Sequence, residues 1–279
     1  VKRERGRNMD LEYIQRSNLP AQLKEKMILS MKNQAKSNLE KLKNSIANSE
    51  EDCTEKYKCT KCKDVTYILT DDGALPCSCK DLREAERILA KSGISKEFAN
   101  KTFDNFDYAR NMQVLNSYNM ARQYVKDFES IKDNRKNSTI FMGSVGGGKS
   151  HLSFAIANAL MKNGVGVIYM GYRDSIMKIK QNVMNMDTYE KIMNRYKQCK
   201  VLLIDDLFKG NITSSDINII FEIVNYRYFN NLAMIISTEK CGSELLEIDE
   251  AIGSRILEMT KDYGIELRGH KLNYRIYDQ

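Results

Sequence analysis

The stretch Gly143-Ser-Val-Gly-Gly-Gly-Lys-Ser150 decides the fold of this chain. Its spacing, G-x-x-x-x-G-K-S, is that of a phosphate-binding loop. An apolar run, "STIFMG" at 138–143, precedes it, and a helical pattern, "SHLSFAIANALMKN" at 150–163, follows it. A glycine-rich run can also be a flexible loop. The strand before and the helix after favour a loop that wraps a nucleotide phosphate.

Each residue type in this loop has a chemical role in holding a nucleotide. The glycines let backbone N–H groups turn inward toward phosphate oxygens. Lys149 would reach the terminal phosphates, and the hydroxyl of Ser150 would complete the shell of a Mg²⁺ ion. The residues expected to bind ATP are Gly143, Ser144, Val145, Gly146, Gly147, Gly148, Lys149, Ser150 and His151.

Short apolar runs alternate with helical patterns over the rest of this region. Alternation of strand and helix predicts an α/β fold with a parallel sheet covered by helices on both faces. The tail adds two strand-like stretches, which predict one or two more strands. The expected strands lie at 138–143, 164–170, 201–206 and 232–238, and the tail stretches lie at 263–269 and 272–278.

The run "VLLIDD" at 201–206 ends in two acids, Asp205 and Asp206. A buried strand that ends this way would place carboxylates beside the phosphate loop. Asp205 would then hold Mg²⁺, largely through water, and Asp206 would orient or activate the attacking water. Many ATPases have Glu at the second position, so the shorter Asp206 predicts slow hydrolysis. The alternative is an edge strand that runs into an acidic turn.

A further strand, "LAMIISTEK" at 232–240, also ends in polar residues. In ATPases of this architecture such a strand lies between the two motif strands, and its polar end senses the γ-phosphate. The candidate sensor residues are Ser237, Thr238 and Glu239. An ordinary transition from strand to turn is the alternative.

Four cysteines form two closely spaced pairs, Cys59-x-x-Cys62 and Cys77-x-Cys79. Four thiolates at these spacings suit tetrahedral Zn²⁺, and a site filled by protein ligands is structural rather than catalytic. Such a metal would hold together a segment too small to fold by burial alone. Cys53 is a spare that could replace one ligand. The alternative is a set of unrelated cysteines.

Composition limits the classes of protein to which the chain can belong. Its 279 residues are 42% hydrophobic and carry 44 Lys and Arg against 37 Asp and Glu, a net charge of +7. This excess fits a nucleic-acid partner as well as a solvated basic helix face. No apolar run is long enough for a membrane span, and the first residues lack the apolar core of a signal peptide. We therefore expect a cytoplasmic protein with reduced thiols.

The order of these motifs resembles the DnaC/DnaI family of helicase loaders, AAA+ ATPases related to the IstB transposition helpers. The resemblance covers most of residues 53–279, and its cysteine pattern is most similar to phage-encoded and Gram-positive members. Besides the cysteines, it rests on "SGISKEFANKTFDNFD" (92–107), "GSVGGGKSHL" (143–152), "VLLIDDL" (201–207), "NYRYFNNLAMIISTEK" (225–240) and "IGSRI" (252–256).

The resemblance implies a division of the chain and a role for each part. The N-terminal part would grip the replicative hexameric helicase. The core would bind ATP, assemble with copies of itself and contact single-stranded DNA. The expected parts are a helical region at 1–50, a zinc module at 51–80, a helical linker at 81–101 and an AAA+ core at 102–279.

The resemblance also assigns individual residues. Arg255 matches the arginine finger, which a neighbouring subunit supplies to the γ-phosphate; from the residues alone, a surface ion pair is the alternative. Phe103 and Phe106 lie where the family's chain approaches the adenine, although plain core packing also suits Phe106. The residues expected to contact single-stranded DNA are Tyr172, Arg173, Lys178 and Lys180. A solvated helix face is the alternative for this last set.

Two other functions remain open at this point. An IstB-like transposition helper would share the core, but the cysteine pairs argue against it. A nucleotide-dependent adaptor with little turnover is consistent with Asp206 in place of Glu. With 24 residues after Arg255, we expect the core to lack the helical lid of many AAA+ proteins. We therefore expect a weak ATPase that depends on assembly or on DNA.

Overall fold

The computed structural model describes residue 22 and residues 57–70, 73–91, 95–109, 111–269 and 272–277. The predicted helical region at 1–50, apart from residue 22, and the spare Cys53 lie outside the described residues. The chain divides into two compact units, Val1–Tyr57 and Lys58–Gln279. All elements below belong to the second unit. None of its described helices is both long and apolar enough to cross a membrane.

A five-stranded sheet forms the centre of this unit, in the order β4-β5-β6-β3-β7. Every neighbouring pair in it is parallel. The predicted parallel sheet is therefore confirmed, and β6 lies between the two motif strands, β3 and β5, as expected. The strands are β3 (Thr139–Gly143), β4 (Val167–Gly171), β5 (Val201–Leu207), β6 (Ala233–Thr238) and β7 (Gly264–Leu267).

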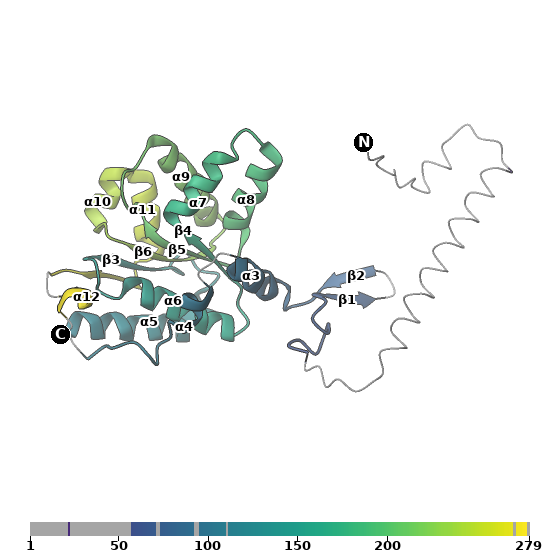
Figure 1. Ribbon diagram of the computed structural model, residues 1–279, viewed down its shortest axis with the longest axis horizontal. Coiled ribbons are helices and arrows are strands. Elements are labelled where there is room, and N and C mark those ends of the chain that lie inside the picture. Colours follow the sequence, from purple (N-terminus) through teal and green to yellow (C-terminus); the bar gives the residue numbers. More distant parts are fainter. Residues whose placement is uncertain are drawn as a thin grey trace. The chain divides into compact units, whose positions relative to one another are not determined.

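Helices cover both faces of the sheet (Figure 1). One face carries α4 (Ser95–Asn100), α5 (Met112–Ile131) and α6 (Lys149–Lys162). The other face carries α7 (Tyr172–Gln181), α8 (Met186–Gln198), α9 (Ser214–Phe229), α10 (Gly242–Ile248) and α11 (Glu250–Met259).

Successive side chains of β5 point to opposite faces of the sheet, and both faces are apolar. Leu202 and Ile204 belong to the apolar cluster on the α9 face, whereas Val201 and Leu203 belong to the cluster on the α6 face. All four side chains are buried. A continuous apolar run of this kind is buried when both faces of its sheet are covered, here by helices. This arrangement places the polar end of β5 at the edge of the sheet where β3 runs into the phosphate loop.

A small antiparallel hairpin lies between the two cysteine pairs. It consists of β1 (Tyr67–Thr70) and β2 (Gly73–Pro76). The helix α3 (Lys80–Lys91) begins at the second cysteine pair, close to the predicted start at residue 81. Ala85 of α3 is buried in the same apolar cluster as the α9 face, and Asp81 pairs with Lys200 at 3.1 Å.

The tail differs in part from its prediction. The stretch 263–269 contains the strand β7, but the stretch 272–278 contains the short helix α12 (Tyr274–Tyr277) rather than a strand. Leu272 is buried, and the backbone N–H of Tyr274 donates to the carbonyl of Gly146 at 3.4 Å. These contacts turn the chain back onto the phosphate loop, so it does not add another strand to the sheet.

Candidate nucleotide site and cysteine cluster

The phosphate loop joins β3 to the N-terminus of α6, as its spacing predicts. Gly148 is the residue before the first turn of α6 and has a φ of +81°, in the left-handed region. Gly146 has a φ of +76°, and a Cβ there would lie 2.1 Å from Oδ1 of Asn273. Glycine is needed at both positions, because other residues rarely adopt this backbone conformation. The loop therefore leads into the start of a helix, where backbone N–H groups bind anions.

Lys149 lies inside this cradle. Its ammonium group donates hydrogen bonds to the carbonyls of Gly143, at 2.8 Å, and Ser144, at 2.7 Å. The side chain is buried, and this burial lowers the pKa of Lys149 from its ordinary value. A desolvated cation held among carbonyls is well placed to meet phosphate oxygens, which are stronger acceptors.

The two acids of β5 and the serine of β6 form one hydrogen-bonded unit. The hydroxyl of Ser237 donates to Oδ1 of Asp205 at 2.5 Å and accepts the backbone N–H of Asp206 at 2.9 Å. Burial raises the pKa of Asp205, while hydrogen bonds from Ser237 and Ser150 act in the opposite direction. The structure thus brings together Ser150 and Asp205, the two residues proposed to hold magnesium.

The backbone is unusual at the end of β5. Asp206 and Phe208 have φ values of +57° and +58°, although neither is glycine. The pairing of β5 with β6 shifts register between Ile204 and Leu207, and Thr238 donates its hydroxyl to the carbonyl of Leu207 at 2.7 Å. Left-handed non-glycine residues cost roughly 1 kcal/mol or more each and often cluster at functional sites. Here they bring the Asp206 side chain to the edge of the sheet.

Sequence reasoning missed one charged residue in this group, Lys209. Its ammonium group lies 2.8 Å from Oδ2 of Asp206 and 3.1 Å from Oε1 of Glu239. The predicted sensor Glu239 is therefore part of an ion-pair group with the second acid. The only sequence signal was a lysine three positions after Asp206, which by itself indicates little.

Aromatic side chains surround the start of α6. Phe106 is buried and stacks on Tyr118, with ring centroids 6.0 Å apart, and it forms a T-shaped pair with His151, with centroids 5.0 Å apart. Phe103 packs edge-on against the same Tyr118 at 5.8 Å. A Cβ on Gly148 would lie 2.6 Å from the Phe106 ring. Phe106 is therefore a core residue and also a neighbour of the phosphate loop.

His151 also belongs to this aromatic group. Its Nε2 atom lies 2.9 Å from the carbonyl of Thr102, and burial lowers the pKa of the imidazole. A neutral ring with Nε2 as the donor satisfies this contact. His151 thus fixes the segment around residue 102 against the first turn of α6.

Arg255 lies on α11 and faces α9. Its guanidinium donates to the carbonyl of Ala251 at 2.7 Å and lies over the rings of Phe221, at 5.6 Å, and Tyr228, at 5.4 Å. Among the described residues, its contacts thus belong to α9 and α11 and not to the phosphate loop of its own chain.

Of the four residues predicted to contact DNA, one is buried and another is held in an ion pair. Tyr172 is 3% exposed and packs edge-on against Phe208 at 5.8 Å, so its ring cannot stack on a base. The prediction for Tyr172 is therefore wrong. Lys180 is paired with Asp216 at 2.5 Å and with the hydroxyl of Thr213.

The other two predicted residues are available to a partner. Arg173 and Lys178 are exposed, and both lie on α7. Arg173 also lies next to the loop after β5. A Cβ atom added to Gly210 in that loop would lie 3.8 Å from the guanidinium carbon of Arg173. The solvent-facing part of the predicted DNA surface is thus reduced to these two cations.

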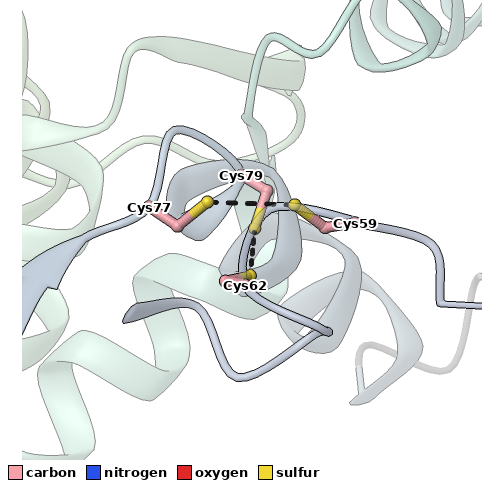
Figure 2. A group of neighbouring side chains, drawn as sticks. All are labelled: Cys59, Cys62, Cys77 and Cys79. Carbon is pink, nitrogen blue, oxygen red and sulfur yellow. Dashed lines mark hydrogen bonds between the residues drawn. The ribbon is translucent and has the colours of Figure 1, made fainter. Parts of the chain in front are cut away.

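The four cysteine sulfurs converge on one point (Figure 2). The sulfurs of Cys59 and Cys77 are 3.8 Å apart, those of Cys62 and Cys79 are 3.4 Å apart, and all four lie within 4.8 Å of one another. Zn²⁺ bound tetrahedrally at about 2.3 Å from each sulfur requires separations of about 3.8 Å. The residues present therefore fit a four-thiolate metal site.

The surroundings of this cysteine cluster hold its first pair of cysteines in place. Asp64 accepts the backbone N–H groups of Lys58, at 3.1 Å, and Cys59, at 2.8 Å, and also binds Arg83 at 2.7 Å. The backbone N–H of Thr66 donates to the sulfur of Cys62 at 3.3 Å. Such outer contacts orient metal ligands and favour the thiolate form.

Comparison with known protein families accounts for the nucleotide site. The family described as "IstB-like ATP binding protein" matches residues 38–258. The chain belongs to this family. The ATP-binding description agrees with the phosphate loop and the acids of β5, and the match includes the cysteine cluster as well as the core.

Individual relatives place this IstB-like protein more closely. It is 36% identical to the phage-like element PBSX protein XkdC of Bacillus subtilis, covering 79% of this chain and 87% of that one. It is 29% identical to the replicative helicase loader DnaC of Escherichia coli, covering 62% of this chain and 68% of that one. The predicted resemblance to the helicase-loader family, with a phage or Gram-positive character, is confirmed.

Solved structures support the fold. A crystal structure of the DnaC helicase loader matches with a TM-score of 0.56 and 24% identity, covering 62% of this chain and 99% of that chain. At this identity the match shows the AAA+ α/β fold of the core.

Proposed function

We propose that this protein is an ATP-dependent loader of the replicative DNA helicase. The observation that carries the proposal is the nucleotide site described above, in a chain similar to the loader DnaC. In this proposal the N-terminal part grips the hexameric helicase, and the core responds to ATP and to single-stranded DNA while the ring is placed on its template.

The geometry supports hydrolysis of ATP to ADP and phosphate. The loop N–H groups and Lys149 would hold the phosphates. Ser150 and Asp205, which are hydrogen-bonded to each other, would hold Mg²⁺, which would neutralise charge on the phosphates. Asp206, fixed through its backbone by Ser237, would orient the attacking water. The short side chain of Asp206 predicts low turnover.

Arg255 would complete the site of a neighbouring copy. It lies on α11 against α9. Among the described residues, it contacts these two helices and not the phosphate loop of its own chain. An arginine supplied in trans would make hydrolysis depend on assembly. Arg255→Ala and Lys149→Ala should each be inactive alone. A mixture of the two should recover activity, because some interfaces pair an intact loop with an intact arginine. A mixture as inactive as its parts refutes the trans role.

The cysteine cluster would hold a structural Zn²⁺ through Cys59, Cys62, Cys77 and Cys79. With all four positions supplied by protein, the metal would brace the hairpin and contribute folding energy. A braced module joined to the ATPase core through α3 suits a rigid attachment for the helicase.

Arg173 and Lys178 would contribute to the DNA surface. Exposed cations on one helix attract the phosphate backbone of a single strand without reading its sequence. The double variant Arg173→Ala/Lys178→Ala should bind a single-stranded oligonucleotide more weakly and with a shallower dependence on salt. An unchanged salt dependence excludes these two residues from the DNA surface.

A transposition helper is the second candidate, because the family is described by its IstB-like members. Binding measurements with the two partner classes separate the candidates. The purified protein should form a complex with the replicative helicase of its own cell, with a mass that depends on ATP. Lys149→Ala should lose that dependence. Failure to bind the helicase, with or without ATP, together with binding to a transposase would overturn the loader proposal.

A further inference from the structure

Lys209 bridges two carboxylates at the edge of the nucleotide site. Its ammonium group is 2.8 Å from Asp206, near the end of β5, and 3.1 Å from Glu239, which follows the neighbouring strand β6. Both acids were expected near the γ-phosphate, one to orient water and one as a sensor. We therefore expect the third phosphate of a bound nucleotide to lie near the cation that links them.

The charge of Lys209 acts on Lys149, as do the charges of the neighbouring acids. Burial lowers the pKa of Lys149 most, and the positive charge of Lys209 adds to that lowering. The negative charge of Glu239 acts in the opposite direction on Lys149. The cation after β5 thus acts on the cation of the phosphate loop across the site.

The backbone of Lys209 is fixed, but its side chain is free to change partner. Its N–H donates to the carbonyl of Asp206 at 3.1 Å, in a turn that the hydroxyl of Thr238 braces at Leu207. The Lys209 side chain is 40% exposed, and its partners are 34% and 33% exposed. Ion pairs this open to solvent contribute little, so exchanging them is easy. A flexible lysine stem allows the ammonium to move.

We propose that Lys209 senses the terminal phosphate of a bound nucleoside triphosphate. It leaves Asp206 and Glu239 for the γ-phosphate oxygens, whose higher charge makes a stronger hydrogen bond. The inference rests on the proposed nucleotide site. It adds that Lys209 makes this site favour a nucleoside triphosphate over the diphosphate. The same exchange frees the Asp206 carboxylate only when a γ-phosphate is present. Water activation is thereby linked to the correct ligand.

The experiment compares the affinities of wild-type protein and variants for a non-hydrolysable ATP analogue and for ADP, with Mg²⁺, by calorimetry. Lys209→Met and Lys209→Gln remove the charge, and Lys209→Arg keeps it. Lys132→Met is the matched control, because Lys132 is similarly exposed, at 43%, and pairs with Glu129 at 2.6 Å on α5. Thermal melting confirms that each variant is folded.

The neutral variants should lose about tenfold in affinity for the ATP analogue, the effect of one charge-assisted hydrogen bond. Their affinity for ADP should stay within about twofold of wild type. Lys209→Arg and Lys132→Met should keep the wild-type ratio. An equal loss for both nucleotides, or an unchanged ratio, would overturn the role of Lys209 and leave the ATP site intact. Wild-type protein that binds neither nucleotide would instead overturn the proposed function itself.

Discussion

Ser237→Ala tests whether one hydroxyl holds both acids of the nucleotide site. The substitution removes the donor to Asp205, at 2.5 Å, and the acceptor of the Asp206 N–H, at 2.9 Å. An unsatisfied buried N–H costs about 1–3 kcal/mol, and a hydrogen bond to a charged group contributes about 1.5–3 kcal/mol. We take the lower ends, since both acids are only half-buried. The free energy of unfolding should fall by about 2.5 kcal/mol.

The same change should shift the pH dependence of magnesium binding. Burial already raises the pKa of Asp205, and the bond from Ser237 opposes this rise. Without that bond the pKa rises further, so Asp205 takes up its proton at a higher pH. Magnesium-dependent nucleotide binding should then be lost at a higher pH than in wild type as the solution is acidified.

Urea denaturation measures the first effect, and nucleotide titrations with and without Mg²⁺ over a pH series measure the second. Ser153→Ala is the matched control, because Ser153 is equally buried and its hydroxyl makes no hydrogen bond to a described residue. A Ser237→Ala variant as stable as the Ser153→Ala control, with an unchanged pH profile, would refute the shared role of this hydroxyl.

Three further outcomes follow from the geometry. Gly148→Ala should lower the free energy of unfolding by about 1–2 kcal/mol in urea, because alanine resists the left-handed backbone; an unchanged value would argue against this turn. Cys59→Ser should bind less zinc per chain than wild type, measured by atomic emission, and should melt at a lower temperature, whereas Cys199→Ser should bind as much zinc as wild type. Equal metal in both variants would remove the cluster as its site. Burial lowers the pKa of His151, so its contribution to stability is present above the unfolded value of about 6.5 and is lost as pH falls below it. His151→Gln should therefore flatten the loss of stability below pH 6.5, and a variant as acid-sensitive as wild type would contradict this.

The core sheet could be predicted from the sequence because its strands contain short, unbroken apolar runs. Runs such as Val201 to Ile204 are buried on both faces, which is typical of parallel strands with helices on both sides of the sheet. The phosphate-loop motif also predicted where β3 ends and α6 begins. Cysteine spacing predicted which four sulfurs converge, but not that Asp64 and Arg83 would brace them.

The errors arose where contacts distant in sequence decide the outcome. The segment 272–278 alternates apolar and polar residues like a strand, but burial of Leu272 and the bond from Tyr274 to the phosphate loop favour a helical turn. Tyr172 begins a charged helix, and only the left-handed turn at Phe208 reveals that its ring is covered. The same turn brings Lys209 to Asp206, which no periodicity in the sequence indicates.

The most direct test of the central claim is a loading assay on a circular single-stranded DNA that carries one annealed strand. The replicative helicase is supplied as closed hexamers, and release of the annealed strand is followed over time. With ATP, the protein should shorten the lag before unwinding, and Lys149→Ala should leave the lag as long as for the helicase alone. An identical lag with and without the wild-type protein would contradict its role as a loader.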